Sequence, residues 1–130
     1  MVDIPNPETA SRSSPDIESN KIVYIYQKDN INSVRLFDLN KKNEKILVES
    51  LSYSMSWPEI SNKYVVWGKD TAQHVSGVEG TNLKTSEIFE IQEQGPHQNG
   101  NLSPILEGNI VSWMAWRTGN GDIYGAILNK

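Results

Sequence analysis

The chain repeats one ten-residue pattern three times: Pro15-Asp-Ile-Glu-Ser-Asn-Lys-Ile-Val-Tyr24, Pro58-Glu-Ile-Ser-Asn-Lys-Tyr-Val-Val-Trp67 and Pro104-Ile-Leu-Glu-Gly-Asn-Ile-Val-Ser-Trp113. Each copy begins with proline, carries an aliphatic residue two places later and ends on an aromatic residue nine places later. The prolines are 43 and 46 residues apart. A pattern that recurs in order at a nearly constant interval indicates a repeat architecture.

The local chemistry of each copy predicts a β-hairpin. Proline restricts its own φ and biases the preceding residue toward extended backbone, so we expect it to begin a strand. A polar turn pair follows, and the residues after it are β-branched or aromatic, which is typical of a central strand. The turn pairs are Ser19-Asn20, Asn62-Lys63 and Gly108-Asn109.

Further short apolar blocks follow each hairpin and predict additional strands. The second blocks are Val34–Leu39, the weaker Val75–Gly80 and Ile123–Leu128, and the third blocks are Glu44–Val48 and Glu87–Ile91. Three or four strands in about 45 residues suit a propeller blade. We therefore predict one all-β domain over residues 1–130, with repeats at approximately 15–57, 58–103 and 104–130. The short piece 2–4 is expected to be an unpaired outer strand that completes a blade.

The repeats resemble the TolB-like, WD40-like (PD40) β-propeller family of bacterial and archaeal surface proteins. The three prolines with their Ile-Val-aromatic strand ends carry the likeness, together with the stretch Trp113-Met-Ala-Trp-Arg-Thr-Gly-Asn-Gly-Asp-Ile-Tyr124. The resemblance implies an extracytoplasmic or cell-surface location. It says little about function, because propellers host unrelated activities.

Three blades make half of the six-bladed ring that the resemblance implies. The two terminal blade faces of a half-ring would expose apolar surface, and large exposed patches generally mark an interface. One hypothesis is that two copies associate through their terminal blades into a closed ring. The alternative is that the chain is a fragment whose remaining blades lie elsewhere in a precursor.

Composition excludes several classes of function. The chain has 130 residues, a net charge of −4 and no basic stripe, which argues against a nucleic-acid partner. It has no cysteine, so disulfides and thiolate metal sites are impossible. No apolar stretch is long enough for membrane insertion, and no signal peptide is visible.

The residue types that catalysis or metal binding needs are few and scattered. The two histidines, His74 and His97, fall in different blocks, and no nucleophile motif occurs. Asp29, Asp70 and Asp122 lie near turns, where an Asn/Gly/Asp-rich loop could bind Ca²⁺, but Gly119–Asp122 reads equally well as a hairpin turn. We therefore predict no catalytic residue, no metal site and no cofactor.

The tryptophans divide into two groups. Trp67 and Trp113 occupy equivalent repeat positions and are expected to pack between blades. Trp57, and Trp116 beside Arg117, are candidates for an exposed stacking surface, although packing in the core or at the rim is the favoured interpretation for Trp116. The predicted binding residues are therefore Trp116, Arg117, Asp122, Trp57 and Asp70.

The favoured function is a non-catalytic interaction module that binds a protein, peptide or glycan near the ring axis. The alternatives are an accessory or gating domain of a hydrolase, which would need convergent carboxylates or a metal, and a structural spacer in a repeat-rich surface protein.

Overall fold

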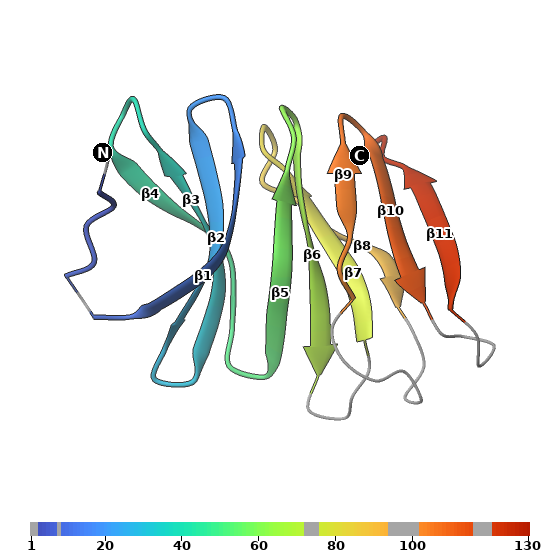
Figure 1. Ribbon diagram of the computed structural model, residues 1–130, viewed down its shortest axis with the longest axis horizontal. Coiled ribbons are helices and arrows are strands. Elements are labelled where there is room, and N and C mark those ends of the chain that lie inside the picture. The colour runs from blue at the N-terminus through green and yellow to red at the C-terminus, as the bar shows by residue number, and fades with distance from the viewer. Residues whose placement is uncertain (1–2, 8, 72–75, 94–101, 116–120) are drawn as a thin grey trace.

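The computed structural model describes residues 3–7, 9–71, 76–93, 102–115 and 121–130, and all regular elements in these ranges are β-strands. They form three antiparallel sheets that stand side by side (Figure 1). The first sheet contains β1 (Ser11–Glu18), β2 (Lys21–Lys28), β3 (Ile31–Asp38) and β4 (Asn43–Ser50). The second contains β5 (Tyr53–Ile60), β6 (Tyr64–Thr71), β7 (Ser76–Asn82) and β8 (Ile88–Glu93). The third contains β9 (Ile105–Glu107), β10 (Ile110–Ala115) and β11 (Asp122–Ile127).

Within each sheet the strands pair in sequence order, as in a propeller blade. The predicted all-β class and the three blade-like sheets are confirmed. The apolar blocks identified from sequence correspond to β3, β4, β7, β8 and β11, and the runs after the turn pairs become the second strands β2, β6 and β10. The hairpin between β2 and β3 turns at Asp29 and Asn30, which both have positive φ, as a type I′ turn requires. Across the described residues, no helix is long and apolar enough to span a membrane.

The expectation that the repeat prolines begin strands was wrong for two of them. Pro15 and Pro58 do not begin strands but lie inside β1 and β5, because both strands start several residues earlier. Each proline sits where the pairing register shifts, between Ser13 and Asp16 and between Ser56 and Glu59. A β-bulge leaves a residue without a ladder partner, so it accommodates the missing N–H of proline.

The N-terminal piece also differs from its prediction. Asp3 and Ile4 form no strand, and Val2 lies outside the described residues. Ile4 instead packs with Ala10 against the buried side chains of Tyr24, Tyr26 and Phe37 on the first sheet. The N-terminal segment, residues 3–10 without the undescribed residue 8, therefore covers a sheet face rather than extending a sheet edge.

Two apolar cores hold the three sheets together. Val23, Ile25, Val34 and Leu36 of the first sheet meet Trp67 and other side chains of the second. Trp113 of the third sheet packs in an equivalent core against the second sheet. Trp67 and Trp113 are almost fully buried, which confirms the expectation that they pack between blades. In both sheets the tryptophan at the end of the repeat faces the preceding sheet.

Candidate functional site

The first strands of the three sheets bring the proline repeats together at one edge of the molecule. Strand β5 contacts both β1 and β9, so the three sheets converge along these strands. A groove of about 500 Å³ runs across them. The described residues that line it form three equivalent tripeptides, namely Ser14-Pro15-Asp16, Trp57-Pro58-Glu59 and Ser103-Pro104-Ile105.

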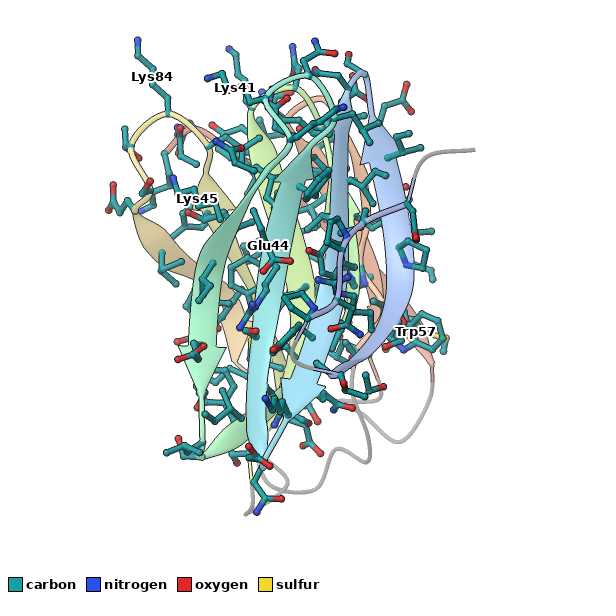
Figure 2. The ribbon with its side chains drawn as sticks, turned by 90° about the vertical axis from the view of Figure 1, so that its left-hand side faces the viewer. Lys41, Glu44, Lys45, Trp57 and Lys84 are labelled. Carbon is teal, nitrogen blue, oxygen red and sulfur yellow. The ribbon has the colours of Figure 1, made fainter. Side chains whose placement is uncertain are left out.

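The bulges in β1 and β5 determine where the groove side chains point. Ser14 and Trp57, which precede the two bulge prolines, have φ values of 52° each. A positive φ is uncommon for a bulky residue such as tryptophan and marks a locally constrained backbone. The consequence for Trp57 is an indole that is 54% exposed and points away from the sheets (Figure 2).

A pair of carboxyl groups lies beside Trp57 in the groove. Burial, a hydrogen bond to Asp16 and the negative charge of Asp16 together raise the pKa of Glu59 to about 7. The Oδ2 atom of Asp16 also accepts a hydrogen bond from the backbone N–H of Ile60 at 2.9 Å, which joins the first sheet to the second. The Glu59 carboxyl group therefore keeps its proton to a higher pH than an ordinary glutamate.

The groove therefore combines three kinds of surface. Trp57 offers an aromatic face, the prolines offer rigid apolar walls, and the Asp16–Glu59 pair offers negative charge that a cation would stabilise. In the part of the chain that the structure describes, no three His, Asp or Glu side chains gather as a metal site would require. The chemistry that these residues support is recognition of an extended ligand with an apolar and a cationic part.

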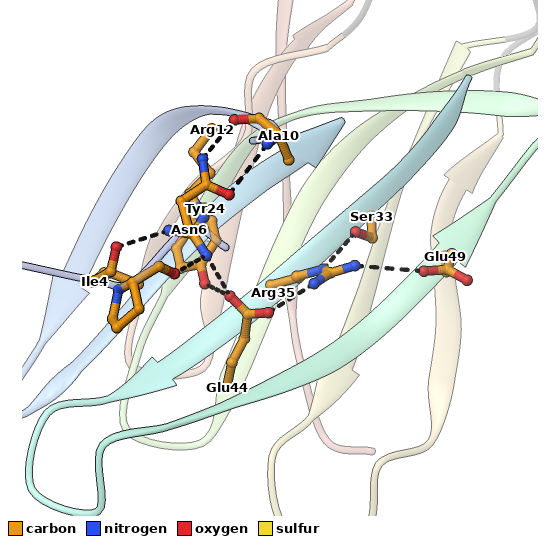
Figure 3. A network of polar contacts seen from close by, with 10 residues as sticks. Ile4, Asn6, Ala10, Arg12, Tyr24, Ser33, Arg35, Glu44 and Glu49 are labelled. Atoms are coloured by element: carbon orange, nitrogen blue, oxygen red, sulfur yellow. Dashed lines mark hydrogen bonds and ion pairs between the residues drawn. The ribbon is translucent and has the colours of Figure 1, made fainter. Parts of the chain in front are cut away.

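A larger cavity, of about 680 Å³, lies between the N-terminal segment and the outer face of the first sheet. Glu44 is the centre of its polar network (Figure 3). Its carboxylate pairs with Arg12 at 3.2 Å and with Arg35 at 2.7 Å, and accepts a hydrogen bond from the hydroxyl of Tyr24. Burial acts to raise the pKa of Glu44, but the hydrogen bonds from Tyr24 and Arg35 and the two arginine charges outweigh it and lower the pKa.

The same network attaches the N-terminal segment to the sheet. Arg12 donates hydrogen bonds to the backbone oxygens of Ile4 at 3.0 Å and Pro5 at 2.8 Å. The guanidinium of Arg35 stacks on the ring of Tyr26, with 3.4 Å between its Cζ atom and the ring centroid. The charges of Arg12, Arg35 and Glu44 in this cavity are therefore already paired with one another.

The structure separates the five predicted binding residues. Trp57 lies in the groove. Asp70 is in β6, where it accepts a hydrogen bond from the hydroxyl of Ser76 at 3.3 Å, and Asp122 is the exposed first residue of β11. Neither aspartate lines the groove. Trp116 and Arg117 lie outside the described residues, as do His74 and His97.

Sequence reasoning missed Asp16 and Glu59. Both follow a repeat proline, so an acidic residue recurs at the same repeat position in the first two copies, while Ile105 takes this place in the third. That recurrence was the available signal. Its meaning depends on the convergence of β1 and β5, which no local pattern encodes.

Comparison with known proteins bears on the fold. No family model matches the chain, and no curated protein matches it significantly. Among solved structures, TolB from Acinetobacter baumannii superposes with a TM-score of 0.73 at 14% identity, over 91% of this chain and 30% of that one. The β-propeller domain of the Trilobed protease from Pyrococcus furiosus, described as having an open velcro topology, gives 0.59 at 16% identity, over 90% and 43%.

An acylaminoacyl peptidase from Pyrococcus horikoshii superposes with a TM-score of 0.65 at 18% identity, over 83% of this chain and 18% of that one. This chain thus spans less than half the length of each of the three solved structures. The likeness concerns architecture alone. The three sheets have the fold of consecutive blades of a TolB-like, WD40-like β-propeller.

Proposed function

We propose that the chain is a non-catalytic binding module whose groove takes an extended peptide segment containing a lysine or arginine. The observation that carries this proposal is the position of the exposed Trp57 next to the Asp16–Glu59 carboxyl pair in a proline-walled groove. An aromatic face and rigid prolines suit the apolar part of a peptide, and the carboxyl pair suits its cationic side chain. A cell-surface or other extracytoplasmic location remains part of this proposal.

The groove is also suited to a peptide by its shape. Its lining residues come from three neighbouring chain segments, at β1, β5 and the start of β9, so the groove extends across the sheets. A peptide lying across it would contact the three equivalent tripeptides in turn. Glycan recognition shares the requirement for an exposed aromatic ring, but a neutral sugar makes no use of the carboxyl pair. That difference favours the peptide.

Two peptide libraries test the proposal, one with a fixed central lysine and one with a fixed central glutamate. Peptides selected from the lysine library should quench Trp57 fluorescence, and their affinity should fall at least ten-fold in Trp57→Ala. Leu51→Ala is the matched control, because Leu51 is 74% exposed and does not line the groove. Equal selection from both libraries, or equal affinity in both variants, would contradict the proposal.

The pH dependence of binding gives an independent test. Glu59 ionises as the pH rises through its pKa of about 7, so a lysine peptide should bind more tightly at pH 8 than at pH 6. In Glu59→Gln this dependence should be lost, because the amide does not titrate. Calorimetry at the two pH values measures it, and an unchanged dependence in Glu59→Gln would exclude Glu59 as the ligand's partner.

An accessory or gating role in a hydrolase is a second candidate, which the superposition on two peptidase structures favours. It would assign the groove to a substrate on its way to a catalytic domain. Both functions predict that the chain binds these peptides and does not cleave them. Faster turnover by a hydrolase when the chain is added would distinguish the second from the first.

A further inference from the structure

The two terminal sheets differ in what covers their outer faces. The outer face of the first sheet carries Tyr24, Tyr26 and Phe37, which are buried under the N-terminal segment. Among the described residues, none covers the outer face of the third sheet. It carries five aliphatic side chains that are between 49% and 75% exposed, namely Ile105, Ile110, Met114, Ile123 and Ile127. We call these five residues the open face.

The strand register shows that the open face is continuous. Ile110 lies opposite Ile127, and Met114 lies opposite Ile123. Residues directly opposite one another in an antiparallel pair point to the same side of the sheet. The five side chains together present on the order of 500 Å² of apolar surface, which is as large as the biggest patch on a typical monomer.

The repeat identifies what such a face packs against. Counted from the repeat prolines, Met114 and Ile123 occupy the positions of Ile25 and Val34 in the first sheet, which are also opposite one another. Ile25 and Val34 are buried against the second sheet, in the core that contains Trp67. By this equivalence, the open face is expected to pack against the face of another blade that carries the aromatic residue at the end of its repeat, as the second sheet does with Trp67.

The second sheet shows which polar groups that side of a blade can carry. Trp67 donates from its Nε1 atom to Glu79 at 3.1 Å, and Lys69 pairs with the same carboxylate at 3.4 Å. Trp67, the aromatic member of this cluster, packs against aliphatic side chains of the first sheet. The outer face of the first sheet has a cluster of the same kind, in which Tyr24 donates to Glu44 and the cations are Arg12 and Arg35.

We propose that the open face packs on the outer face of the first sheet of a second copy of this chain. The contact joins unlike faces, so a two-fold axis through the converging first strands would repeat it and close a ring of two chains. Each copy would then bury both of its terminal faces, which together approach the area per partner of a standard dimer, about 800 Å².

The N-terminal segment competes with the second copy for the same face. Ile4 and Ala10 occupy it within one chain, but they fill it incompletely, since the cavity of about 680 Å³ remains beneath the segment. A tethered segment competes at high effective concentration. The ring should therefore form at tens of micromolar chain rather than at nanomolar concentrations, and loosening the segment should favour it.

Sedimentation velocity on the full chain and three variants tests the proposal. Ile123→Asp places a charge on the open face, and Leu51→Asp places one at an aliphatic residue of matched exposure outside both faces, 74% against 75%. The dissociation constant of the dimer should rise at least 100-fold in Ile123→Asp and stay within two-fold in Leu51→Asp. A wild-type chain that is monomeric at 1 mM, or an Ile123→Asp chain that dimerises like the wild type, would overturn it.

Ile4→Ser decides which face the partner uses. It weakens the packing of the segment on the first sheet without altering any side chain of the sheets. The dissociation constant of the Ile4→Ser dimer should therefore be on the order of ten-fold lower than that of the wild type. If two open faces instead packed on each other, the N-terminal segment would be irrelevant. A dimer that is lost in Ile123→Asp but unchanged in Ile4→Ser would therefore overturn the unlike-face arrangement.

Discussion

The outer faces of the first and third sheets lie at the two ends of the same row of blades, but they differ in how their apolar side chains are covered. The first has aromatic rings and paired charges, and a segment of its own chain covers it. The third carries exposed isoleucine and methionine side chains, and none of the described residues covers them. In a repeat protein each unit buries its faces against its neighbours, so the terminal units need separate provision. Within the described residues, such a cover is present on the first sheet.

The largest expected effect on stability comes from placing an aspartate at equivalent repeat positions of a face that is packed between two sheets and of the open face. Ile25→Asp puts a carboxylate into the core between the first and second sheets and should cost about 4 kcal/mol or more of unfolding free energy. Met114→Asp, at the equivalent position on the open face, should change it by no more than about 0.5 kcal/mol. Urea unfolding of dilute, monomeric chain measures both. Similar losses would mean that the open face is buried within one chain.

A smaller effect is expected from the two glutamate clusters. Glu79→Ala leaves Trp67 and Lys69 without their carboxylate between two sheets and should cost about 3 kcal/mol. Glu44→Ala removes the carboxylate that Tyr24, Arg12 and Arg35 share under the N-terminal segment, where water has more access, and should cost about 1–2 kcal/mol. Glu107→Ala, at an exposed position of the third sheet, is the control. A greater loss in Glu44→Ala than in Glu79→Ala would reverse the ranking of the two environments.

The smallest effect is a difference in how acid affects the cover of the first sheet. The folded-state pKa of Glu44 is lowered, so its contribution to stability is present above its ordinary pKa of 4.5 and is lost as the pH falls through the lowered value. The protection of the N-terminal segment against amide exchange, measured relative to the unprotected rate at the same pH, should therefore decrease below pH 4.5 in the wild type. In Glu44→Gln this protection should already be low at pH 6 and change little with acid. Protection that depends equally on pH in both would show that Glu44 does not hold the segment.

The strand content and the order of the strands were predictable because they depend on local patterns. The turn pairs, the β-branched runs and the apolar blocks each specify a strand or a reversal within a few residues, and all of the predicted blocks became strands. Trp67 and Trp113 were recognised as core residues because the repeat gave them equivalent positions. The resemblance to TolB-like propellers pointed to the same architecture, which the superposition supports.

The site was predicted only in part. Trp57 was chosen correctly as an exposed tryptophan, but its neighbours were not, because Asp16 and Glu59 are 43 residues apart and meet only where two sheets converge. The role of the prolines was misjudged for a related reason. A proline suits both the start of a strand and a bulge within it, and only the pairing of β1 with β2 and of β5 with β6 distinguishes the two.

The sequence by itself determined that this chain is a row of short-stranded sheets, since side-chain alternation and turn chemistry act over a few residues and need no distant partner. Tertiary structure decided which faces are covered. Whether Ile4 forms a strand or packs on Tyr24, and whether Asp16 meets Glu59, depends on the free energy of burying surfaces that lie far apart along the chain. That free energy depends on shape in three dimensions, so the groove and the unequal ends of the molecule become visible only in the folded chain.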